Sequence, residues 1–148
     1  MLNHMNSQRS SLRQPAVVAW LRLARIYQKV DAASARLFKD FGLSTAQFDV
    51  LAHIGAAEGL SQQDLAAALL VTKGNISQIL ERMEHEGIVT RQQEGRTKLL
   101  FLTVRGRELY RQAVGHQEEH IATLFATLDH NEQLALGRLL RQLDHALD

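Results

Sequence analysis

The 148-residue chain contains no cysteine, a single proline and a single tryptophan. Without cysteine it can form no disulfide, no thiol-based redox switch and no thiolate metal site. No apolar run approaches the roughly 20 residues of a membrane span, and the N-terminus lacks the apolar core of a signal peptide. These absences predict a soluble, cytoplasmic protein.

Signatures of catalysis are also missing. The sequence contains no Gly-x-Ser-x-Gly nucleophile elbow, and its nine glycines form no phosphate-cradling motif. A chain of this length fits one domain, large enough to bury roughly two thirds of its unfolded surface. We therefore expect a single domain spanning residues 1–148 that is not an enzyme and needs no cofactor.

The net charge of +1 conceals a strong division along the chain. Residues 1–39 carry seven Lys or Arg and one acid, and residues 72–111 carry eight and five. Residues 40–71 carry four acids and no Lys or Arg, whereas residues 112–148 carry two basic residues and six acids. We interpret the basic charge of residues 1–39 as a solvated face and that of the predicted wing, within residues 72–111, as a binding surface.

The most informative stretch runs from Leu60 to Thr103 and reads as two short helices followed by a hairpin. Ser61, with Asp64 three residues later, resembles a capping box that opens the first helix. Thr72 offers a hydroxyl cap to the second helix, and Gly87 is placed to end it. The second helix has an apolar side that repeats with a helical period, made of Ile76, Ile79, Leu80 and Met83.

The other side of this second helix is small and polar over its first turns. A DNA-reading helix-turn-helix presents such a surface, because the N-terminal end of its second helix enters the major groove. A solvent-facing helix is the plain alternative. The predicted DNA contacts from this helix and its cap are Thr72, Lys73, Gly74, Asn75, Ser77, Gln78 and Arg82.

A small β wing is predicted next. Residues 88–90 begin one strand, residues 99–102 form another, and the polar segment 91–98 links them with a turn at Gly95. Three cations, Arg91, Arg96 and Lys98, lie on or beside this link. An arginine at the tip fits the negative potential of a narrow minor groove, and Arg96 is the candidate.

The order of these pieces resembles the MarR family of winged helix-turn-helix transcription regulators. The resemblance is carried by residues 43–51, by Met83-Glu84-x-x-Gly87-Ile88-Val89, and by the wing, where Glu94-Gly95-Arg96 is followed five residues later by Leu102-Thr103. Two departures are a glutamate in place of the family's aspartate and a wing link about three residues shorter than usual. The resemblance implies a DNA-binding regulator, expected to be a repressor released by a small-molecule ligand.

Long helices are predicted on both sides of this unit. One covers residues 12–41 with Pro15 in its first turn, one covers residues 44–57, one runs from Thr103 through Leu128, and a leucine-rich helix follows a break at residues 129–131. The expected fold is mainly α with a small β wing. It comprises a disordered tail (1–11), a winged helix-turn-helix core (44–103) and dimerisation helices (12–41 and 107–148).

The surplus apolar residues of the terminal helices favour a homodimer. Such a dimer places two recognition helices about one DNA turn apart on pseudo-palindromic operator DNA. An intramolecular role for the leucine stripe is the alternative. The resembled family binds small aromatic or anionic ligands near the dimer helices, where Trp20, Tyr27 and Phe48 are candidates here, although each also fits a plain core or surface position.

Two further interpretations remain open. His116 and His120 are spaced four residues apart, which suits zinc, and zinc-responsive members of the resembled family use such a pair, with acids for which Asp31 and Asp49 are candidates here. Two exposed histidines without metal are favoured over such a site. The short wing also leaves a protein-interaction module without DNA binding as an alternative.

Overall fold

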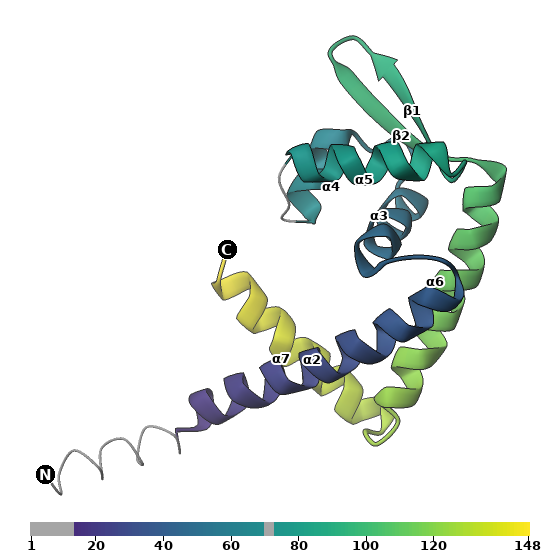
Figure 1. The fold of residues 1–148 in the computed structure, drawn as a ribbon. Helices are drawn as coiled ribbons and strands as arrows, with labels where there is room; N and C mark the ends of the chain where they lie inside the picture. Colours follow the sequence, from purple (N-terminus) through teal and green to yellow (C-terminus); the bar gives the residue numbers. More distant parts are fainter. Residues whose placement is uncertain (1–13, 70–72) are drawn as a thin grey trace, which may run out of the picture.

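The computed structural model describes residues 14–69 and 73–148. Over these ranges the chain forms six helices and one two-stranded sheet, which confirms the predicted mainly α fold with a small β wing. Figure 1 shows the short helices and the wing at one end and the long helices at the other. The elements are α2 (Pro15–Asp40), α3 (Thr45–Ala56), α4 (Gln62–Ala68), α5 (Lys73–His85), β1 (Val89–Glu94), β2 (Thr97–Leu102), α6 (Val104–Leu124) and α7 (His130–Ala146).

The helix starts are set by local sequence. Pro15 occupies the first turn of α2, where its missing N–H costs no hydrogen bond. The Ser44 hydroxyl accepts from Gln47 N at 3.1 Å while Gln47 Oε1 accepts from Ser44 N at 3.0 Å, so α3 begins with a complete capping box. The predicted starts of α3 and α6 are therefore confirmed, with Thr103 capping α6. The predicted tail at residues 1–11 lies outside the described residues.

The wing is longer and its turn tighter than predicted. The link expected over residues 91–98 is wrong, because β1 and β2 stay paired out to Glu94 and Thr97 and leave only Gly95 and Arg96 as the turn. Gly95 has a φ of 60°, a conformation that glycine adopts without steric cost. A two-residue turn lets the strands pair along their whole length, which stiffens the wing.

The end of α6 also differs from the prediction. The helix stops at Leu124 instead of Leu128, and α7 begins at His130 with Asp129 as its cap, so the break lies at residues 125–129. The Gln133 side chain donates to Phe125 O at 3.2 Å and to Leu128 O at 3.0 Å. These bonds satisfy carbonyls that a continued helix would otherwise pair, so the earlier end costs little.

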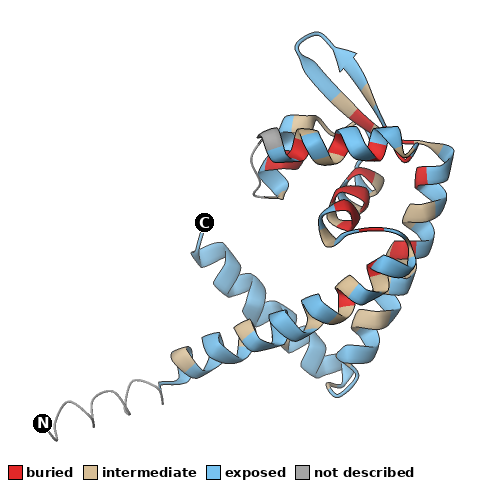
Figure 2. Cartoon of the chain, in the orientation of Figure 1, coloured by how far each residue is buried: buried red, intermediate tan, exposed pale blue. Residues whose placement is uncertain are grey.

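The core gathers around the helix-turn-helix unit. Figure 2 places the buried residues on α3, α4, α5, the wing base and the adjoining parts of α2 and α6. The largest fully buried side chains all lie between residues 50 and 100: Val50, Leu51, Ile54, Leu65, Ile76, Leu80, Met83, Val89 and Leu100.

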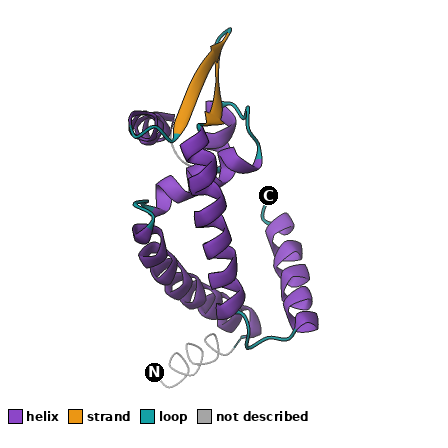
Figure 3. Cartoon of the chain, turned by 90° about the vertical axis from the view of Figure 1, so that its right-hand side faces the viewer, coloured by secondary structure: helices purple, strands orange, loops and turns teal. Residues whose placement is uncertain are grey.

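The terminal helices contrast with this core. Helix α7 has no buried residue, and in Figure 3 it stands apart from the other helices. In α2 only Ser34 and Phe38, both in its C-terminal third, are buried. Within the described ranges, no helix is both long and apolar enough to span a membrane.

Candidate nucleic-acid interface

Helices α4 and α5 form the helix-turn-helix. The Ser61 hydroxyl accepts from Asp64 N at 3.0 Å and caps α4. Helix α5 turns Ile76, Leu80 and Met83 into the core, where each is at most 1% exposed. This anchoring directs the opposite side of α5 outward. On that side Asn75, Gln78 and Arg82 are exposed and Ser77 is half-buried.

The start of α5 holds the remaining predicted contacts of the helix. Lys73 and Gly74 are its first two residues, so they occupy the end that a recognition helix directs into the major groove. Thr72, predicted as the cap, lies outside the described residues. Arg82, in the last turns of α5, pairs with Glu86 at 3.2 Å on the surface.

Arg91 is half-buried and paired with a residue of α5. It lies on β1 opposite Leu100, and its guanidinium contacts the Glu84 carboxylate of α5 at 3.2 Å, with the side chain only 16% exposed. The hydrogen bonds from Arg91, helped by the charge of Lys98, hold the pKa of Glu84 below its ordinary value of 4.5. This ion pair ties the wing to the recognition helix.

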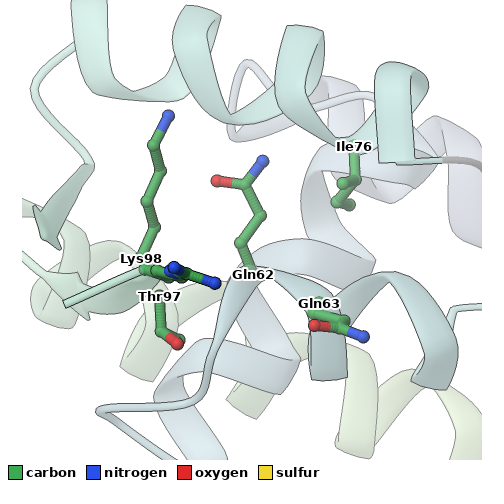
Figure 4. A pocket seen from close by; sticks show the side chains of 6 residues that line it. Gln62, Gln63, Ile76, Thr97 and Lys98 are labelled. Atoms are coloured by element: carbon green, nitrogen blue, oxygen red, sulfur yellow. The ribbon is translucent and has the colours of Figure 1, made fainter. Parts of the chain in front are cut away.

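Arg96 and Lys98 remain available at the wing. Both are exposed, and neither forms an ion pair within residues 14–69 and 73–148. They line a hollow of about 230 Å³ together with Thr97, Ile76 and two α4 residues, Gln62 and Gln63. In Figure 4 the Lys98 and Gln62 side chains extend in the same direction, toward the helix that carries Ile76. No local pattern in the sequence pointed to the two glutamines, because only folding brings α4 beside the wing.

The base of the wing is fixed by contacts that span long stretches of sequence. Leu100 exchanges backbone hydrogen bonds with Gly59 and Leu60 at 2.8 and 2.9 Å, which adds a short third segment beside β2. Glu58 accepts from Leu102 N at 3.2 Å and pairs with Arg107 at 3.3 Å. The wing therefore leaves the core as a rigid extension.

The predicted effector residues are not brought into one cavity of this chain. Trp20 and Tyr27 are 65% and 69% exposed on α2. Phe48 is buried in α3 and stacks on Phe38, with the two ring centroids 3.9 Å apart. Trp20 and Tyr27 thus face outward, whereas Phe48 belongs to the core.

The two histidines of α6 have different surroundings. His116 packs against the Phe41 ring with centroids 5.3 Å apart, whereas His120 Nε2 is buried without a hydrogen-bond partner. Gln117 donates to the buried Ser34 hydroxyl of α2 at 3.0 Å, while its own Oε1 is buried and unpaired. In the part of the chain that the structure describes, no three His, Asp or Glu side chains are grouped to hold a metal.

Two helices whose second member exposes a polar face, followed by an antiparallel hairpin beside that face, define a winged helix-turn-helix protein of the DNA-binding class. Comparisons with known proteins agree. The family model described as MarR family matches residues 41–98. An HTH-type transcriptional regulator of Bacillus cereus is 37% identical over 125 residues, which cover 84% of this chain and 85% of that protein. The chain belongs to the MarR family of DNA-binding transcriptional regulators, which are not enzymes.

Solved structures share the fold. A MarR family protein of Mycobacterium tuberculosis in complex with DNA has a TM-score of 0.72 and 26% identity, covering 83% of this chain and 94% of that one. The MepR–DNA complex of Staphylococcus aureus has a TM-score of 0.77 and 24% identity, covering 86% and 96%. Both relatives were crystallised on DNA, the ligand class for which the exposed face of α5 is suited.

Proposed function

We propose that this protein is a homodimeric repressor that occupies pseudo-palindromic operator DNA and is released by a small-molecule ligand. The observation that carries the DNA part is the arrangement of α5. Its apolar side is anchored in the core, its polar side faces outward, and the wing cations stand beside it. We place this activity in the cytoplasm, because its partner is operator DNA.

The proposed DNA contacts differ in the part of the DNA that they reach. Lys73, Asn75, Ser77 and Gln78 are proposed to reach base edges or backbone in the major groove, with Gly74 allowing close approach. Thr72 is proposed to hold a phosphate at the start of α5. Arg96 enters the minor groove, and Lys98 and Arg82 contact phosphates. Arg91 acts through Glu84 by fixing the direction of the wing.

The dimer rests on the apolar surfaces of α2 and α7. Large exposed apolar patches mark interaction surfaces, and these two helices carry most of the exposed large apolar side chains. Two copies joined there place their α5 helices about one DNA turn apart, roughly 10 base pairs between half-site centres. The exposed large apolar residues on these helices are Val18, Trp20, Leu21, Ile26, Tyr27, Leu134, Leu139, Leu140, Leu143 and Leu147.

Release by a ligand is supported by polar groups at the contact of α2 and α6. Gln117 Oε1 and His120 Nε2 are buried there without partners, and burying an unpaired polar atom costs free energy. A small aromatic or anionic ligand that also carries a hydrogen-bond donor would satisfy these groups. In the proposed dimer, the two α5 helices can be one DNA turn apart or at another separation. The ligand lowers DNA affinity only as far as it binds the second arrangement more tightly than the first.

The test is selection of random duplex DNA by the purified protein, followed by titration of the enriched site at several salt concentrations. We expect a palindrome with half-sites one turn apart. Arg96→Ala should lower the slope of log affinity against log salt by about one, since one phosphate-lined contact is lost. Arg141→Ala, on α7, is the matched control and should leave the slope unchanged.

Three outcomes contradict parts of this proposal. No enrichment of any duplex, with zinc present or absent, supports the interaction module and overturns the DNA role. Enrichment that requires zinc and is lost on His116→Ala supports the metal-responsive alternative. A promoter carrying the enriched site should be transcribed less when the protein is added, so increased transcription would overturn the repressor role.

A further inference from the structure

Two hollows flank the recognition helix. The first lies at the wing and contains Arg96 and Lys98. The second, of about 430 Å³, lies where the C-terminal end of α2 and the start of α3 meet α5, and the prediction from sequence did not include it. We call it the corner hollow, and it is lined by Lys39, Gly42, Leu43, Ser44, Gln47, Ile79 and Arg82.

Most of the corner hollow is internally satisfied. Ser44 and Gln47 cap each other through two hydrogen bonds, and Leu43 is buried. Gly42, with a φ of 71°, turns the chain between α2 and α3 and adds no side chain to the wall. The groups that still attract a ligand are therefore the two cations, and their ligand is an anion.

Both cations can be engaged from solution. Lys39 is exposed and forms no ion pair within the described residues. The Arg82 side chain is 76% exposed, and its pair with Glu86 lies on one helix surface at spacing i, i+4. Exposed pairs of this kind contribute little stability, so Arg82 can exchange Glu86 for another anion at small cost.

The shape of DNA supplies such anions on both sides of α5. A recognition helix about 10–12 Å across fills a major groove about 12 Å wide, so a sugar-phosphate backbone passes along each flank of the helix. Arg82 lies one turn beyond Gln78 on the outward side of α5. The wing cations serve one flank, and the corner hollow offers cations from α2 and α5 on the other.

We propose that Lys39 and Arg82 together bind a DNA backbone phosphate on the flank of α5 opposite the wing. This inference rests on the proposed DNA-binding function and adds a residue of α2 to the interface. Because Lys39 lies in the last turn of the helix proposed for dimerisation, the contact also ties the position of α2 to the register of the protein on DNA. A phosphate contact positions the protein and carries no base preference.

The experiment measures the affinity of the full-length protein for its selected duplex at several salt concentrations. Lys39→Gln should lower the salt slope by about one and weaken binding by a similar factor on the selected site and on unrelated duplex DNA. Gln78→Ala should instead change the preference among sequences. Lys29→Gln, an exposed lysine of the same helix outside both hollows, should leave the slope unchanged.

The outcomes separate this inference from the function on which it rests. If the unmodified protein binds duplex DNA in a salt-dependent way and Arg96→Ala lowers the slope, an unchanged slope for Lys39→Gln overturns the corner-hollow site alone. If the unmodified protein shows no salt-dependent binding, both proposals fail. Thermal unfolding of Lys39→Gln should match that of the unmodified protein, because the side chain is exposed.

Discussion

The winged helix-turn-helix unit and the terminal helices of this protein both contain many apolar residues, but only the unit buries most of them. In the unit, leucines such as Leu51 and Leu80 are fully buried by their own chain. In α7, Leu139 and Leu143 are more than half exposed, and the helix buries none of its residues. One region buries its apolar residues within a single chain, whereas the other exposes the apolar surface that the proposed dimer covers.

The difference has an energetic meaning. Burying a leucine side chain is worth about 1.5–3 kcal/mol relative to leaving it in water, so the core residues stabilise the isolated unit. In the proposed dimer, the terminal leucines gain this free energy only on association. Folding and dimerisation should therefore respond to different substitutions.

The largest expected effect is on the core. Leu80→Ala removes a fully buried side chain of α5 and should lower the free energy of unfolding by about 3 kcal/mol. Urea denaturation followed by circular dichroism measures this change. The control Val104→Ala alters a residue that is 83% exposed and should shift stability by no more than about 0.5 kcal/mol. Equal losses in both variants would disprove the assigned core.

The second effect should fall on association. Leu143→Asp places a carboxylate on the leucine-rich side of α7, and burying an unpaired charge in an interface is strongly unfavourable. Sedimentation equilibrium should then show a monomer at concentrations where the unmodified protein is a dimer. Arg138→Asp introduces the same carboxylate on the other side of the helix and should leave the dimer intact. If the unmodified protein is itself a monomer, the terminal helices do not form the proposed dimer interface.

The smallest effect is expected where the two regions meet. Burial raises the pKa of the Asp49 carboxyl above its ordinary value of 3.8, with nearby His53 opposing the rise and Asp31 adding to it. Since protonation favours the folded state, this contribution to stability is complete below pH 3.8 and is lost as the pH rises through the raised pKa. The ionised carboxylate therefore costs stability at neutral pH.

Asp49→Asn should accordingly raise the thermal unfolding temperature at pH 7, and the gain should vanish below pH 3.8. Asp31→Asn removes only the neighbouring like charge and should give a smaller rise. Differential scanning calorimetry across this pH range measures both. A stabilising effect of Asp49→Asn that persists unchanged in acid would show that charge is not its cause.

Much of the fold was predictable because its signals are local. The hydroxyl caps at Ser44, Ser61 and Thr103 each bond to a residue three positions later. The apolar repeat of residues 76–83 can likewise be recognised within a single helix. The end of α6 was misplaced because its decisive bonds come from Gln133, in the next helix. The length of the wing was underestimated because polar residues such as Gln92 and Gln93 continue the ladder on an exposed hairpin.

The candidate site likewise has one part that could be predicted from the sequence and another that could not. The exposed positions of α5 follow from its period, so the sequence alone places Gln78 and Arg82 outward. Whether a cation is available depends on its neighbours in space. The sequence places Arg91, Arg96 and Lys98 on or beside the wing link, yet only Arg91 among them meets a carboxylate, that of Glu84, seven residues earlier on α5.

By itself, the sequence determined the capped starts of α3, α4 and α6, the glycine turn of the wing and the motifs of the MarR family, because each depends on residues a few positions apart. Only the tertiary structure decided that Glu84 pairs with Arg91, that Lys39 and Arg82 line one hollow, and that α7 buries none of its residues against the described part of the chain. Those facts depend on which distant surfaces meet, and contacts between distant residues leave no periodic or spaced pattern in a single chain.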